Sequence, residues 1–292
     1  MMRDASDGVT RPAKLWLDRK ISRIALGVLI PGAILLLWHL ASDSAVIPSI
    51  GGTFSVFLKP FREPPNLDAR PFATNIIVSI LRVLTGFVLG AITAVPLGIL
   101  VGTSRVADRL IMPTVETLRP ICPIAWLPVA IIVFGLSSPA TTFWGYDSWK
   151  FDTLDQLRYA MVFIIWWGAF FPIFVNTVAG VRGVKTLYLD AARMLGARRW
   201  AIFRKVILPA SLPNILTGLR VGMGTAWMVI VAAEFFPGTV AGLGYLITAS
   251  HQVAEYEYAF ASIIVIGALG LFFNKGLLLL SDKLCGWTAK ER

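Results

Sequence analysis

Charged residues are scarce in this 292-residue chain, where Asp, Glu, Lys and Arg together make up 15% of the sequence. A soluble domain usually carries about 25% charged residues. Hydrophobic residues make up 56% of the chain and fall in long blocks. Several blocks are long enough for a helix to cross a hydrocarbon layer of about 30 Å. The composition therefore excludes an ordinary soluble domain and predicts an all-α, polytopic membrane protein.

Histidine and cysteine are also nearly absent. The two histidines, His39 and His251, and the two cysteines, Cys122 and Cys285, lie far apart and lack metal-ligand spacing. A membrane enzyme would need several such groups facing one another at membrane depth. We therefore expect no catalytic residue, no metal site and no disulfide framework.

A phosphate-binding loop of the G-x-x-x-x-G-K-[ST] type is missing as well. The nearest approach to it is the stretch from Gly180 to Thr186, in which Val184 stands where glycine must precede the lysine. The chain is therefore not expected to bind or hydrolyse ATP, and no cofactor is predicted for it.

Six apolar blocks predict membrane-spanning helices, separated by connections rich in Pro, Gly and polar residues. The blocks occupy residues 24–41, 76–103, 113–136, 159–181, 212–233 and 259–281. The first block, preceded by basic residues and followed by small ones, resembles a signal peptide. Its length favours an uncleaved span. Pro120, Pro123 and Pro128 are expected to kink or break the third helix.

The net charge of +10 is distributed unevenly. Most Lys and Arg residues lie in the N-terminal segment, in residues 104–112 and 182–208, and at the C-terminus. This asymmetry indicates membrane orientation rather than nucleic-acid binding, and it predicts an inner-membrane protein with both termini in the cytoplasm. The chain then divides into a cytoplasmic segment 1–23, a six-span domain 24–281 and a cytoplasmic tail 282–292.

Small residues recur at every fourth position in two of the predicted spans. They are Gly86, Gly90, Ala94, Gly98 and Gly102 in the second span, and Gly218, Gly222 and Ala226 in the fifth. Such stripes let helix backbones approach closely in lipid, where apolar side chains provide little drive for association.

The cytoplasmic loop 182–208 carries the most specific signal. From Leu189 to Pro213 it reads LDAARMLGARRWAIFRKVILPASLP, which predicts a helix, a stop at Gly196 and a second short helix. A glycine at such a turn permits a left-handed backbone conformation. The stretch resembles the "EAA" loop of binding-protein-dependent ABC importer permeases, with Asp190 where that family usually has Glu. The residues that carry this resemblance or extend it are Asp190, Ala191, Ala192, Gly196, Ala197, Leu208 and Pro209.

Other stretches resemble the nitrate/sulfonate/taurine/bicarbonate branch of that family. They are LRPICPIAWLPVAI (118–131), GLRVGMGTAW (218–227), the Ala-Ala-Glu sequence 232–234 and GLGYLI (242–247). The stretch 137–159, rich in aromatic and acidic residues, departs from the branch. It is interpreted either as a surface for a binding protein or as an aromatic belt at the membrane interface.

The resemblance implies a type I importer permease that forms the pathway for a small solute, and the resemblance to the branch alone implies an anion of the nitrate, bicarbonate or sulfonate kind. It implies ABC ATPase subunits that bind ATP and Mg, a periplasmic or lipid-anchored binding protein, a second copy of the permease and surrounding lipid. A secondary carrier is a rival, although no internal repeat is evident. A permease of another branch, for a vitamin precursor, is a further alternative.

Polar residues inside spans are candidates for the substrate pathway because they are costly in lipid. For each candidate, helix packing is the alternative role. Arg82 is interpreted either as a residue that attracts anions or as one whose side chain reaches the membrane interface. Glu234 is interpreted as part of an outer gate. The full set is Arg82, Asn176, Thr177, Thr225, Met228 and Glu234.

Overall fold

The computed structural model describes residues 29–42, 47–64, 67–144, 155–235 and 239–286. No strand occurs among these residues, which agrees with the predicted all-α class. The chain separates into two compact units, residues 1–58 and 59–292. The predicted segment 1–23, residues 145–154 of the aromatic stretch and part of the predicted tail lie outside the described residues.

The first unit contains two described helices. The apolar helix Leu29–Ala41 corresponds to the described part of the first predicted span. Helix α2 (Ile50–Leu58) follows it. The indole of Trp38 donates a hydrogen bond to the carbonyl of Pro48 at 3.0 Å, which connects the end of the first helix to the residues before α2.

The second unit contains the helices that are long and apolar enough to cross a membrane. Within the described residues there are five such ranges: Phe72–Thr103, Pro123–Phe143, Tyr159–Arg182, Arg199–Ala233 and Tyr256–Leu284. Together with Leu29–Ala41 they follow the order of the six predicted blocks. The second, fourth, fifth and sixth predictions are confirmed as helices, each of which extends beyond the predicted range at one end or both.

The third predicted span is wrong as a single helix over residues 113–136. Helix α4 (Arg105–Leu118) ends before Pro120, and the chain resumes as the 3-10 turn η1 (Pro123–Trp126) and helix α5 (Leu127–Phe134). Prolines remove an N–H donor and disfavour helical geometry in the preceding residue, which accounts for the break. Gly135, with φ +60°, ends α5 before α6 (Pro139–Trp144).

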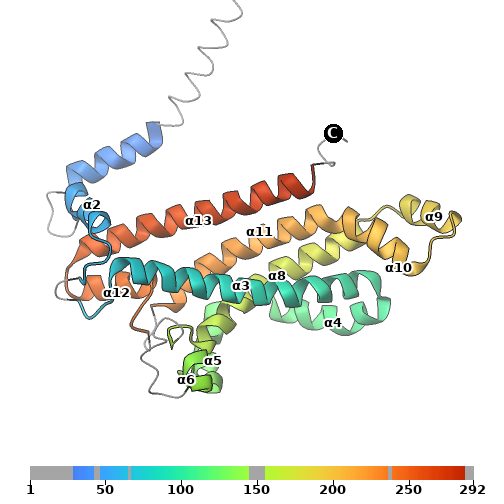
Figure 1. Cartoon of the computed structure of the whole chain (residues 1–292), viewed down its shortest axis with the longest axis horizontal. Coiled ribbons are helices and arrows are strands. Elements are labelled where there is room, and N and C mark those ends of the chain that lie inside the picture. Colours follow the sequence, from blue (N-terminus) through green and yellow to red (C-terminus); the bar gives the residue numbers. More distant parts are fainter. Residues whose placement is uncertain (1–28, 43–46, 65–66, 145–154, 236–238, 287–292) are drawn as a thin grey trace, which may run out of the picture. The chain divides into compact units, whose positions relative to one another are not determined.

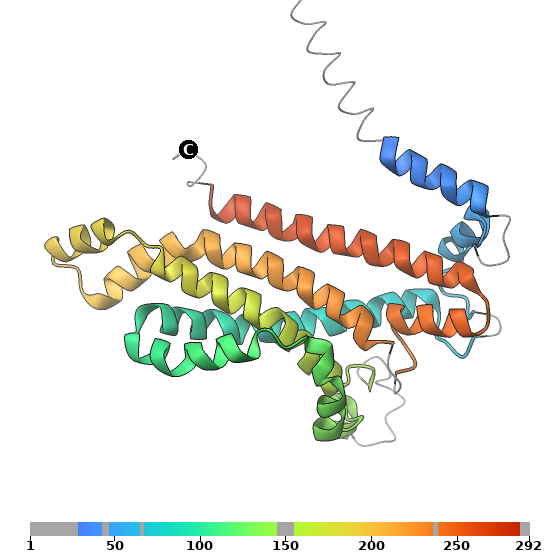
Figure 2. The same cartoon turned by 180° about the vertical axis from the view of Figure 1, so that it is seen from behind.

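Residues 104–112, predicted as a loop, are also helical. Ser104 ends α3 (Phe72–Thr103), and its side chain accepts a hydrogen bond from the Ala107 amide at 3.3 Å. This cap starts α4, which folds back alongside the end of α3 (Figures 1 and 2). The connection therefore shrinks to one residue.

Helix α8 (Tyr159–Arg182) lies between α3 and α11 (Leu208–Ala233) and packs closely against both (Figure 1). A Cβ atom added at Gly86 of α3 would lie 2.6 Å from Ile165 Cβ of α8. One added at Gly222 of α11 would lie 2.7 Å from Ile173 Cγ1 of the same helix. Both predicted small-residue stripes thus face α8, and close backbone approach is confirmed.

Helices α12 (Leu243–Gln252) and α13 (Tyr256–Leu284) follow α11. Trp227 of α11 donates from Nε1 to the carbonyl of Ile266 at 3.0 Å, and its ring lies tilted against that of Phe273, which attaches α13 to the core. Much of the rest of α13 exposes large apolar side chains, as expected of a lipid-facing helix.

Gly86→Ala is expected to lower the free energy of unfolding by about 1–3 kcal/mol, because the new methyl group would overlap the Ile165 side chain. Gly267→Ala in α13 is the matched control, since a Cβ there meets nothing within 4 Å. Thermal unfolding of the purified protein in detergent measures both variants. Equal midpoints for the two would contradict close packing of α3 on α8.

Candidate functional site

An open groove of 380 Å³ runs between α8, α11 and the break after α4. Three of the predicted pathway residues line it, namely Asn176 of α8 and Thr225 and Met228 of α11. Met228 is 75% exposed, so the groove opens onto the surface of the single chain. Other lining residues include Arg119, Pro123 and Trp167, which were not selected from the sequence.

A proline explains how Thr225 is held. Pro172 lies inside α8 and has no N–H, so the carbonyl of Gly168, four residues earlier, loses its usual helical partner. The Thr225 hydroxyl lies 2.9 Å from that carbonyl oxygen. Asn176 Nδ2 donates to the carbonyl of Pro172 itself at 2.8 Å. Polar side chains thus lie within hydrogen-bonding distance of the carbonyls around the proline, as membrane helices require.

The other three predicted pathway residues do not line this groove. Thr177 of α8 is buried against α3. A Cβ atom added at Gly98 of α3 would collide with the Thr177 Cβ, and the Thr177 hydroxyl donates to the Ile173 carbonyl. Arg82 and Glu234 are 0% exposed and bind one another. The interpretation of Arg82 as a side chain that reaches the membrane interface is therefore wrong.

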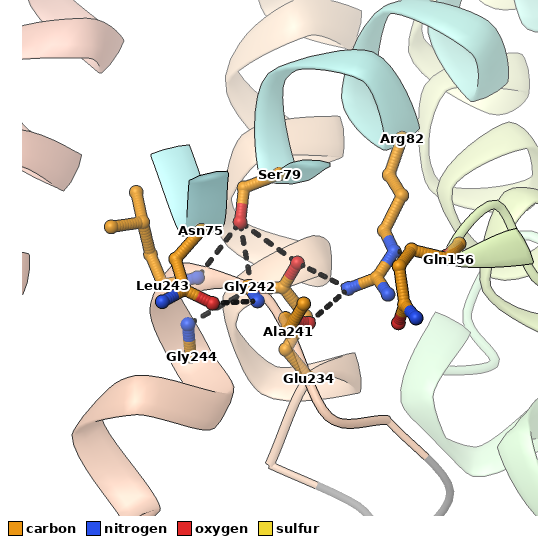
Figure 3. A network of polar contacts seen from close by, with 9 residues as sticks. All are labelled: Asn75, Ser79, Arg82, Gln156, Glu234, Ala241, Gly242, Leu243 and Gly244. Atoms are coloured by element: carbon orange, nitrogen blue, oxygen red, sulfur yellow. Dashed lines mark hydrogen bonds and ion pairs between the residues drawn. The ribbon is translucent and has the colours of Figure 1, made fainter. Parts of the chain in front are cut away.

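Arg82 and Glu234 form the centre of a buried polar network (Figure 3). Glu234, the residue after α11, accepts from Arg82 Nη1 at 2.8 Å, from Ser79 Oγ at 2.8 Å and from the Gly244 amide at 2.9 Å. Arg82 also donates to the carbonyls of Ala241 at 2.9 Å and Gln156 at 2.8 Å. The carboxylate and the guanidinium are each held by several elements at once, which repays part of the cost of burying charge.

The same network holds the start of α12. Asn75 Oδ1 accepts from the Gly242 amide at 2.8 Å, and Ser79 Oγ accepts from the Leu243 amide at 2.9 Å. Gly242 has φ +127°, and a Cβ there would collide with the Glu234 carboxylate, so only glycine suits this position. The sequence did carry a signal for the α3 residues, since positions 75, 79 and 82 share one helical face.

The loop 182–208, which the sequence predicts to be cytoplasmic, forms a helical knob. Helix α9 (Thr186–Met194) ends at a turn where Gly196 has φ +74°, followed by α10 (Arg199–Ile202) and the π-helical turn η3 (Phe203–Ile207). The Ala197 amide donates to the Ala192 carbonyl at 3.0 Å and closes the end of α9. The predicted helix, glycine turn and second helix are therefore present.

The two arms of the knob enclose a second hollow of 600 Å³, lined by Ala191, Ala192 and Leu195 on one side and Pro209 on the other. Leu208 and Pro209 begin α11, so this span is continuous with the knob through η3. Asp190 lies on the exposed side of α9 and pairs with Arg193 at 2.9 Å. Met194 and Leu195 are 90% and 87% exposed. Exposed apolar residues beside a hollow are typical of a protein-docking surface.

Neither hollow carries a cluster suited to metal chemistry. Among the residues that the structure describes, no group of three or more His, Cys, Asp or Glu side chains is placed to hold a metal ion. The groove offers a hydroxyl, an amide, a thioether, an indole and one guanidinium on an apolar wall, an arrangement that can bind or pass a small solute.

Comparison with known proteins agrees with this arrangement. Residues 86–284 match the family described as binding-protein-dependent transport system inner membrane component. A protein of Methanocaldococcus jannaschii named as an ABC transporter permease is 38% identical over 90% of this chain and 92% of its own length. The bicarbonate transport system permease of Synechococcus elongatus is 32% identical over 85% of this chain and 86% of its own length. A Bacillus subtilis protein named as an aliphatic sulfonates transport permease is 32% identical over 89% of this chain and 87% of its own length.

Solved structures share the fold. A chain of an inward-facing methionine ABC transporter superposes with a TM-score of 0.56, covering 72% of this chain and 94% of that one at 15% identity. A chain of a bacterial ABC transporter involved in alginate import superposes with a TM-score of 0.50, covering 92% of this chain and 99% of that one at 17% identity. The fold is that of a type I ABC importer permease. With its spans, its knob and its groove, the chain belongs to the family of binding-protein-dependent transport system inner membrane components.

Proposed function

We propose that this ABC importer permease subunit carries a small anion, and that the groove between α8 and α11 is one half of the translocation pathway. The observation that carries the proposal is the meeting of Asn176, Thr225 and Met228 in one groove between two helices that are long and apolar enough to span a membrane. The groove is open on the side where Met228 is exposed. A second copy of the chain facing this side would complete a closed path.

The substrate class is inferred from relatives. Two similar proteins are named for transport of bicarbonate and of aliphatic sulfonates, which are both small anions. Bicarbonate, nitrate and a short sulfonate are therefore the substrates to examine first. A binding protein, periplasmic or lipid-anchored, would deliver the anion to the outer end of the path.

Energy would come from partner ABC ATPases that bind ATP and Mg. The proposed docking surface is the knob formed by α9, the Gly196 turn and α10, with its exposed Met194 and Leu195. Because η3 runs directly into α11, a movement of the knob would be transmitted to the helix that carries Thr225 and Met228.

Orientation follows from the same assignment. The knob and the α3–α4 turn carry clustered Arg and Lys, so that side is proposed to face the cytoplasm of a bacterial inner membrane. With the six spans predicted from the sequence, both termini would lie on the cytoplasmic side.

Affinity purification of the tagged chain from gently solubilised membranes, followed by mass spectrometry, tests the proposal. ABC ATPase subunits and a solute-binding protein are expected to co-purify. The recovered binding protein is then titrated with bicarbonate, nitrate and ethanesulfonate. Absence of any ATPase under conditions that preserve other importer complexes would contradict the proposal and favour a secondary carrier. Binding of a vitamin precursor instead of anions would contradict the substrate class alone.

A further inference from the structure

Arg119 is the one ionisable residue among those that line the groove. It caps the C-terminal end of α4, directly before the break at Pro120. The remaining lining is apolar or neutral, with Asn176 and Thr225 as its polar side chains. The electrostatic character of the groove therefore depends on this guanidinium.

Arg119 lies at the end of α4 that is remote from the turn between α3 and α4. At the other end of α4, Asp108 in its first turn forms an ion pair with Arg182, the last residue of α8. Arg119 follows Asp108 by three helical turns, which corresponds to a rise of about 16 Å at 1.5 Å per residue. Arg119 is therefore well separated from this ion pair.

A guanidinium beside apolar spans needs a partner or an aqueous path. Arg82, which is inside the span α3, is paired with Glu234. In the part of the chain that the structure describes, the Arg119 guanidinium has neither a carboxylate partner nor a hydrogen-bond acceptor. The groove that Arg119 lines offers it an open path.

Trp167 lines the groove together with Arg119. Its indole Nε1 is buried and has no acceptor within the described residues. A guanidinium presents N–H donors in a planar fork that matches carboxylate and other oxyanion geometry. One such group in an open groove can attract an anion without holding it too tightly to be released.

We propose that Arg119 is the residue of the pathway that contacts the anion and selects it over neutral solutes. This inference rests on the proposed function, because it assigns the charge selectivity of the same groove. Asn176 and Thr225 would then contribute to the shape and polarity of the groove, and Arg119 to its preference for negative charge.

The test uses the complete transporter, with its ATPases and binding protein, reconstituted in liposomes. Uptake of labelled bicarbonate, nitrate and ethanesulfonate is measured with and without internal ATP, and the probe taken up by the wild type is carried forward. Arg119→Gln is expected to lower ATP-dependent uptake about tenfold or more, the size expected for loss of a charge-assisted contact. The same variant should keep the stimulation of ATP hydrolysis by loaded binding protein.

Two further variants separate contact from structure. Arg119→Lys keeps the charge and should retain part of the uptake. Arg109→Gln removes an exposed arginine from the same helix outside the groove and should transport like the wild type. Wild-type uptake by Arg119→Gln would overturn the inference alone, as would equal loss of uptake and of stimulated ATP hydrolysis. No ATP-dependent uptake of any probe by the wild type would overturn the proposed substrate class, and the inference with it.

Discussion

Glu234→Gln is expected to lower the free energy of unfolding by about 3–5 kcal/mol, because it removes the only charge that compensates buried Arg82 within the described network. The substitution keeps the shape of the side chain, so a packing defect does not explain the loss. Thermal unfolding in detergent and the fraction of extracted protein that elutes as a single species measure the effect.

The exposed pair Asp190–Arg193 provides the matched control. Both side chains are largely exposed, at 60% and 66%, so Arg193→Gln should change the free energy of unfolding by less than about 1 kcal/mol. A Glu234→Gln variant as stable as this control would contradict the central role of the buried pair.

The double variant Arg82→Met with Glu234→Gln tests the physical cause. If an uncompensated charge destabilises the single variant, removing the second charge should recover part of the loss. Recovery should be incomplete, because the carbonyls of Ala241 and Gln156 lose their donor. Purely additive losses in the double variant would show that lost hydrogen bonds, rather than charge, dominate.

Gly196→Val is expected to weaken functional coupling by about tenfold while leaving the membrane-embedded helices intact. Gly196 has φ +74°, which costs a residue with a side chain about 1–2 kcal/mol, and a β-branched residue suits it least. No atom lies within 4 Å of a Cβ placed there, so the effect comes from the backbone and not from a clash. Relief of the strain would open the Ala197–Ala192 hydrogen bond and reorient α10 relative to α9.

Gly196→Asn is the control for that prediction, because asparagine tolerates a left-handed backbone better than other residues with side chains. ATPase recovered with the tagged chain and ATP-driven uptake are measured for both variants. Valine should lower each by tenfold or more, as a strain of that size allows, and asparagine only slightly. Equal behaviour of the two variants would contradict the requirement for this turn, and unchanged coupling in both would contradict the proposed docking role.

Several features of the molecule follow from local sequence. Long apolar blocks predict spans because each helix satisfies its own backbone hydrogen bonds in lipid, whatever its neighbours are. The turn at Gly196 also follows from local sequence, because it depends on a few successive residues. The small-residue stripes of α3 and α11 predicted close packing correctly, although they did not indicate that α8 is the common partner.

The third span shows where local reasoning was incomplete. Its prolines indicated a break, but the apolar block around them was interpreted as one helix over 113–136. The structure ends α4 at Leu118 and turns residues 105–112 into the start of that helix. The Ser104 cap and the prolines set the ends of the helix, and Ala107 and Val115 pack it into a core formed with distant segments.

The candidate site required the tertiary structure most. Asn176, Thr225 and Met228 could be selected from the sequence as polar or unusual residues inside spans, but nothing in it joined them to Arg119 in one groove. Arg82 and Glu234 were selected separately, Arg82 for anion attraction or for reaching the membrane interface and Glu234 for an outer gate, whereas they bind one another across 152 positions of the chain.

By itself, the sequence determined the membrane class, the order of the helices, the helical knob and the resemblance to importer permeases, because periodicity, apolar length and backbone-specific residues act over a few neighbouring positions. Only the tertiary structure decided which charges neutralise one another and which remains unpaired in a groove. Those outcomes depend on the approach of helices far apart in the sequence, and burial of a charge is stable only when the folded chain brings its partner to it.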